Sequence, residues 1–139
     1  MAKYKFKIPN WSRWGDGPFT SVSSRVGKTL AAAERGGEHV LFVFEGEVSG
    51  LVLLHDQDCC EDVRVEDVVG DLEDLVGTPI LRAEESSEDA PQEYGSGTWT
   101  YYKLGTVKGD VDIRWLGTSN GYYSESVTAY RADVTKEEQ

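Results

Sequence analysis

The chain of 139 residues has the length of one ordinary domain and carries a formal net charge of -11. A chain of this length can bury a continuous core without a disulfide or metal staple, and its 4 Trp and 7 Tyr supply aromatic surface for one. The negative charge excludes duplex nucleic acid and anionic membrane as partners, because neither can release counterions to a surface of its own sign. The net charge does not exclude a small anionic ligand that binds in a locally positive pocket.

The sequence predicts a cytosolic protein. No apolar run reaches the ~20 residues of a membrane span, and residues 1–5 are not followed by the apolar core of a signal peptide. The two cysteines, Cys59 and Cys60, are adjacent, and successive Cβ atoms of an extended chain point apart. We therefore expect two reduced thiols, which are the rule in the cytosol.

Residues 1–26 form a basic and aromatic arm. Residues 1–28 hold six basic side chains against one acidic side chain, so the rest of the chain carries the entire excess of negative charge. Large apolar side chains recur along the arm: Tyr4, Phe6, Ile8, Trp11, Trp14 and Phe19. We expect the arm to dock on the acidic body as an extended strand or lid. An exposed arm that captures a partner is the alternative.

Residues 27–132 are expected to form a single β-rich domain. Alternating or continuous apolar residues predict strands over 28–34, 38–45, 51–54 and 63–66. One helical turn is expected over residues 71–79, because Asp71 can cap it and Pro79 prevents its continuation. The acidic stretch 84–97 has no periodicity and is predicted to be a surface loop.

The C-terminal third has the clearest alternation. Strands are expected over residues 98–104, 110–116 and 122–132, and Asn120-Gly121 predicts a tight hairpin between the last two. The three strands would form a meander, followed by a frayed acidic tail over residues 133–139. The fold class is therefore mainly β, an antiparallel sheet or small β-sandwich with one short helical turn, with an α+β arrangement as the alternative.

Two long polar motifs are distinctive: HDQDCCE at residues 55–61 and SNGYYSE at residues 119–125. With shorter matches at residues 70–79, 98–102 and 113–115, the sequence resembles a family of small bacteriophage proteins of unknown function over about residues 27–127. The resemblance implies a phage or prophage origin and action in the cytoplasm of an infected bacterium. It implies no reaction.

The first motif has the side-chain inventory of a metal site. Zinc is disfavoured because its thiols are normally spaced as C-x2-4-C. A calcium loop that starts at Asp56 and Asp58 would need a glycine and a closing glutamate at a fixed spacing, and the sequence does not have them there. We expect no metal or cofactor, and a tight turn held by these carboxylates. A small metal-dependent or hydrolytic enzyme that uses residues 55–61 is the competing hypothesis.

The second motif contains residues that favour a β-hairpin turn and also residues that are suited to line a binding pocket. Its tyrosines can stack on a ring and Arg114, on the strand before it, can hold an anion, although a nearby carboxylate is the ordinary partner of such an arginine. We predict one binding surface where the two motifs meet. Its residues would be His55, Asp56, Asp58, Glu61, Arg114, Asn120, Tyr122, Tyr123 and Ser124.

These observations favour a nonenzymatic phage accessory protein that binds a host component. The most plausible form is a counter-defence factor that occupies a host protein or sequesters a small nucleotide signal. A structural or virion-associated module is a further alternative, and self-association into a homo-oligomer stays open.

Overall fold

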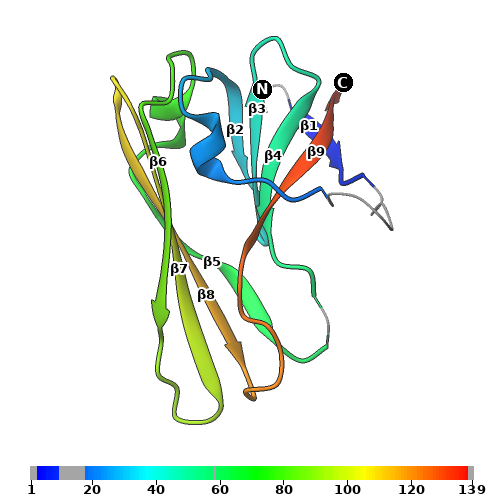
Figure 1. The fold of residues 1–139 in the computed structure, drawn as a ribbon, viewed down its shortest axis with the longest axis vertical. Helices are drawn as coiled ribbons and strands as arrows, with labels where there is room; N and C mark the ends of the chain where they lie inside the picture. Colours follow the sequence, from blue (N-terminus) through cyan, green and yellow to red (C-terminus); the bar gives the residue numbers. More distant parts are fainter. Residues whose placement is uncertain (1–2, 10–17, 58, 138–139) are drawn as a thin grey trace.

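The computed structural model describes residues 3–9, 18–57 and 59–137, which form two antiparallel sheets (Figure 1). The five-stranded sheet has the order β1 (Lys3–Lys7), β9 (Thr128–Glu137), β4 (Ser49–Leu54), β3 (His39–Phe44) and β2 (Leu30–Arg35). The four-stranded sheet has the order β5 (Asp62–Val69), β8 (Gly109–Ser119), β7 (Ser96–Thr106) and β6 (Arg82–Asp89). Two 3-10 turns, η1 (Val22–Arg25) and η2 (Leu72–Leu75), complete the described structure. The predicted mainly β class with a short helical turn is confirmed.

The main core lies between the two sheets. Alternate residues of each strand point inward, and the largest of the fully buried side chains are Trp115, Tyr102 and Phe42. Each such side chain stabilises the fold by about 1.5–3 kcal/mol relative to an exposed one. The helical turn closes this core as predicted: the Asp71 carboxylate accepts from the Glu73 N–H at 3.0 Å, and Leu75 is fully buried.

A second apolar cluster covers the other face of the five-stranded sheet. Leu41, Val43 and Val52 are buried there, and Tyr4 and Phe6 of the N-terminal segment pack against the same cluster. This explains why β3 is apolar at nearly every position. The predicted docking of the arm is confirmed for β1, which pairs antiparallel with β9 along its whole length. Trp11 and Trp14 lie outside the described residues.

The surface loop predicted over residues 84–97 is wrong in its first half. Residues 82–89 form β6, which pairs in register with β7 from Arg82 to Asp89. β6 is an edge strand with its side chains mostly exposed, so it keeps the backbone pairing of a strand without the apolar alternation that would reveal one.

The predicted meander and tail are also wrong. β9 pairs with β1 and β4 of the other sheet instead of with β8. Its apolar residues suit this position because both faces of the strand are covered there. Ala129 faces the main core, while Tyr130 and Ala132 face the second cluster. β9 begins at Thr128 and continues to Glu137, so residues 133–137 are strand and not a frayed tail. Within the described part of the chain, no helix is long and apolar enough to cross a membrane.

We predict that Phe6→Ala lowers the free energy of unfolding by about 2 kcal/mol, because the half-buried Phe6 ring contributes to the second apolar cluster and lies 5.0 Å from the His39 ring. Urea unfolding measures the change. Lys7→Ala, on an exposed position of the same strand, is the control and should change stability by less than ~0.5 kcal/mol. Equal stability of Phe6→Ala and the control would show that β1 contributes only its backbone pairing.

Candidate functional site

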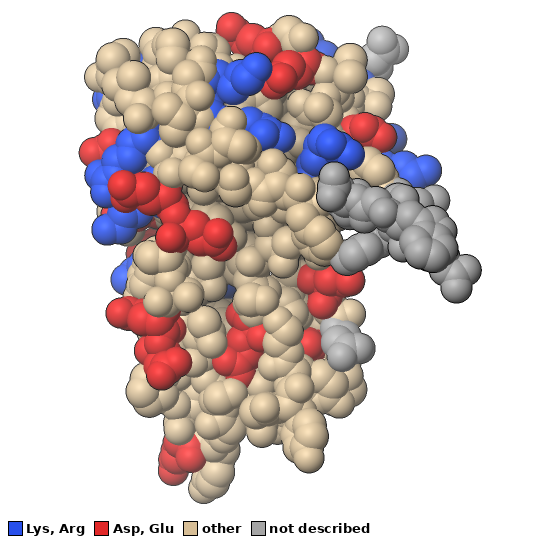
Figure 2. All heavy atoms as spheres, in the orientation of Figure 1, with Lys and Arg blue, Asp and Glu red and all other residues tan. Residues whose placement is uncertain are grey.

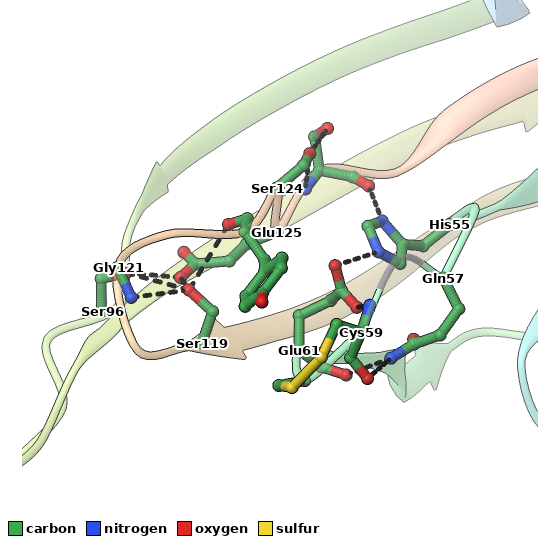
Figure 3. Close-up of polar contacts among 12 residues, drawn as sticks. His55, Gln57, Cys59, Glu61, Ser96, Ser119, Gly121, Ser124 and Glu125 are labelled. Atoms are coloured by element: carbon green, nitrogen blue, oxygen red, sulfur yellow. Dashed lines mark hydrogen bonds and ion pairs between the residues drawn. A yellow bond between two sulfur atoms is a disulfide. The ribbon is translucent and has the colours of Figure 1, made fainter.

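Residues of the two polar motifs lie close together (Figure 3). We call residues 55–61, which connect β4 to β5, the first loop, and residues 119–126, which lead from β8 toward β9, the second loop. The ring nitrogen Nδ1 of His55 donates a hydrogen bond to the backbone carbonyl of Ser126 at 2.8 Å. Segments 71 positions apart in the sequence are therefore joined directly, as the predicted meeting of the motifs requires.

Three side chains of the first loop, those of His55, Gln57 and Glu61, make contacts within the loop. His55 Nε2 lies 3.4 Å from Glu61 Oε2, and the two side chains are 6% and 0% exposed. The other carboxylate oxygen of Glu61 accepts from the Cys59 N–H at 2.9 Å, and Gln57 donates to the carbonyl of Glu61 at 2.7 Å. Removing one of two buried polar groups in contact is costly, because the other is left buried without its neighbour. His55 and Glu61 thus hold the loop in shape, while Asp56 is exposed and Asp58 lies outside the described residues.

The expectation of two reduced thiols is wrong, because Cys59 and Cys60 form a disulfide with each other. That expectation rested on an extended chain, whereas both residues lie in a bend, where successive Cβ atoms do not alternate. Both cysteines are exposed. Among the residues that the structure describes, no group of three or more His, Cys, Asp or Glu side chains is placed to hold a metal ion, and thiols joined in a disulfide do not supply thiolate ligands.

Glu125 holds the second loop against the four-stranded sheet. Its carboxylate accepts hydrogen bonds from Ser96 and Ser119 at 2.5 Å each and from Thr98 at 2.9 Å. Burial raises the pKa of the Glu125 carboxyl, but the hydrogen bonds from Ser119, Ser96 and Thr98 outweigh it, so the pKa lies below its ordinary value. The backbone also approaches closely: a Cβ on Gly117 would lie 2.3 Å from the carbonyl oxygen of Glu125.

The tip of the second loop is a turn between sheets and not a hairpin. The Asn120 side-chain oxygen accepts from the Tyr122 N–H at 3.0 Å, and Gly121 has a φ of 97°. The strand predicted over residues 122–132 begins only at Thr128, so Tyr122 and Ser124 lie before it and not on it. Tyr122 is 90% exposed, Tyr123 is half-buried, and Ser124 is exposed beside Ser126.

Arg114 does not belong to this group. It lies in the middle of β8 on the outer face of the four-stranded sheet, in register with Asp67, to which it donates at 2.8 Å. A carboxylate across the sheet is the ordinary partner that the sequence suggested for this arginine.

One exposed aromatic residue at this end was missed by the sequence reasoning. Tyr94, in the connection between β6 and β7, is 85% exposed, and this connection lies at the same end of the molecule as the second loop (Figure 1). The two segments touch, because a Cβ on the neighbouring Gly95 would lie 2.0 Å from the carbonyl oxygen of Ser119. In the sequence, these close contacts of the second loop are marked by Gly95 and Gly117, where a side chain would collide with the loop backbone. They are also marked by the hydroxyl residues Ser96 and Thr98, at inward positions of β7, which donate to Glu125.

A family model described as a domain of unknown function (DUF7448) matches residues 23–129. The chain belongs to this family. The matched residues contain both loops and all strands except β1 and most of β9. Searches of curated proteins and of solved structures found no match.

We predict that Glu61→Ala lowers the free energy of unfolding by about 3 kcal/mol, because it removes the buried carboxylate that lies against His55 Nε2 and accepts from the Cys59 N–H. Chemical denaturation measures this. Asp56→Ala is the control in the same loop and should cost less than ~0.5 kcal/mol, because Asp56 is exposed. A similar small cost for both variants would contradict a structural role of the buried pair.

The lowered pKa of Glu125 predicts a pH dependence. A carboxyl whose pKa is lower in the folded state contributes stability above its unfolded pKa, and this contribution is lost as the pH falls through the folded value. Between about pH 6 and pH 3, the wild type should therefore lose more stability than Glu125→Gln. Thermal melting across that range measures the difference. Parallel pH profiles of the two proteins would contradict the prediction.

Proposed function

We propose that this protein is a nonenzymatic accessory protein of phage or prophage origin that binds a host protein through the end where the two loops meet. The observation that supports this proposal is that some residues at this end hold the loops in place while others are exposed to solvent. His55, Glu61 and Glu125 fasten the loops to each other and to the sheet, while Tyr122 and Tyr94 project into solvent. Exposed tyrosines on a rigid base are common anchors of protein interfaces, because they bury a large area at low cost in side-chain entropy.

A protein partner fits this end better than a nucleotide signal. Residues 55–61 and 119–126 contain no Lys or Arg, so the loops have no cation to hold a phosphate. On the face shown in Figure 2, basic side chains gather in the upper part, while acidic and uncharged side chains occupy the lower part. A host protein that offers an apolar pocket for a tyrosine and basic residues around it would match this surface.

Two observations count against the alternative of a hydrolytic or metal-dependent enzyme in the first loop. The His55 and Glu61 side chains are almost completely buried, which keeps them from a substrate. The cysteines are joined to each other and so offer no thiolate nucleophile. A counter-defence factor that blocks a host protein by occupying its surface needs no such chemistry.

We predict that Tyr122→Ala weakens binding to the host partner about tenfold or more, because an exposed tyrosine at the centre of an interface is typically worth ~1.4 kcal/mol or more. The wild type is first used as bait in a bacterial lysate, and the retained protein is then purified and titrated calorimetrically. Tyr94→Ala is the second test variant.

Val107→Ala is the matched control. Val107 is 74% exposed in the turn between β7 and β8, at the opposite end of the molecule (Figure 1). It should leave both binding and melting temperature unchanged. If the purified partner binds Tyr122→Ala and Tyr94→Ala as tightly as the wild type, the proposed surface is wrong.

A further inference from the structure

The outer face of the four-stranded sheet carries a hollow of about 400 Å³. All four strands contribute to it, with Val69 from β5, Arg114 from β8, Lys103 from β7 and Glu88 from β6 among the lining residues. These are the outward positions of the strands, since their neighbours Tyr102, Leu104 and Ile113 are buried in the main core. The hollow has the size of a small-molecule site, which starts at about 300 Å³.

One aromatic ring, that of Tyr101, lines the hollow, and the Trp99 ring stacks beside it. The rings of Trp99 and Tyr101, at alternate positions of β7, have centroids 6.4 Å apart and planes inclined by 20°. Both residues are only partly buried, and the Arg114 guanidinium lies 6.0 Å from the Trp99 ring. Partly exposed rings of this kind offer an apolar surface to a ligand that also carries polar groups.

The charges around the hollow balance each other. Lys103 is in register with Asp112 across the β7 and β8 pair, and both line the hollow. The other two charged lining residues are also of opposite sign: Arg114 donates to Asp67, and Glu88 accepts from the Tyr101 hydroxyl at 2.6 Å. Two cations and two carboxylates leave no net charge for an ionic ligand to neutralise.

The polar groups instead alternate between donors and acceptors over a short distance. Lys103 donates, the carboxylate of Asp112 accepts, and the Ser86 hydroxyl can do both. In the described part of the chain Lys103 has no ion-pair partner within 4.0 Å, so its ammonium group is available to a ligand. A ring that bears several hydroxyls satisfies such a lining, because each hydroxyl is donor and acceptor at once.

We propose that this hollow is a binding site for a neutral carbohydrate. The apolar face of a sugar ring packs on Tyr101, and its hydroxyls bond to Lys103 and Asp112. A nucleotide would bring its phosphates against the carboxylates of Glu88 and Asp112, and a cationic peptide would meet Lys103 and Arg114. The site lies on a sheet face and not at the loop end, so it does not depend on the function proposed above.

The first experiment is a glycan array probed with the labelled full-length protein, with neutral, sialylated and sulfated glycans side by side. ATP is titrated separately by calorimetry as the anionic probe. The proposal expects binding to neutral glycans. Binding to none of the glycans, binding to anionic glycans alone, or tighter binding of ATP than of any neutral glycan would overturn it.

The second experiment assigns the bound neutral glycan to the hollow. Tyr101→Ala and Lys103→Ala should each weaken its calorimetric affinity about tenfold, because each removes one of the two kinds of contact. Both residues are on the outer face, so melting temperatures should stay within about 4 °C of the wild type.

The matched control is Arg64→Ala, on the same face of β5 but outside the lining residues, where Arg64 pairs with Asp62 and Glu66. It should bind the glycan as the wild type does. If Tyr101→Ala and Lys103→Ala are folded and retain full affinity, or if Arg64→Ala loses as much affinity as they do, the glycan binds elsewhere and the proposal fails.

Discussion

The carboxylate of Glu125 holds the chain at the point where it leaves one sheet and enters the other. Three hydroxyls from β7 and β8 converge on it, and Gly117 allows its backbone to lie against β8. From this point the chain continues to the five-stranded sheet, where β9 lies between β1 and β4. Both apolar clusters depend on that crossing, because β9 contributes Ala129 to one of them and Tyr130 to the other.

The elements predicted most accurately are those whose signal is local. β3 and β4 are continuous apolar runs, and the η2 turn has its cap at Asp71 within the same few residues. β6 was missed because the apolar pattern that reveals a strand reflects burial, and an edge strand with exposed side chains has little burial. The partners of β9 were missed because pairing between distant strands leaves no periodicity. Asn120-Gly121 makes the local turn that its residues favour, but a turn does not require that the next strand pair with the previous one.

The structure places Ser126, the residue after the second motif, against His55 of the first motif, while the binding surface predicted there stays a prediction. His55 and Glu61 are predicted to contact a ligand because they lie in the first motif, yet their side chains are buried and contact other parts of the protein. Arg114 was expected near the loops, but strand register places it beside Asp67, several residue pairs from the β5 and β8 ends where the loops begin. A polar motif in a sequence indicates a constrained structure. It does not distinguish groups that contact a partner from groups that position the loop.

The charge distribution then decides which kinds of contact each surface can use. The net charge of -11 repels anions at long range, but this repulsion is screened beyond roughly 8 Å at physiological salt. At contact distance the local balance matters, and it differs between the two surfaces: the loops have acidic side chains without a basic one, whereas the hollow on the sheet has matched cations and carboxylates. Under the two proposals, a partner at the loop end would contact the projecting rings of Tyr94 and Tyr122, and a ligand on the sheet face would use hydrogen bonds and a ring contact. Neither of these kinds of contact needs a net positive charge on the protein. Both are therefore compatible with so acidic a chain.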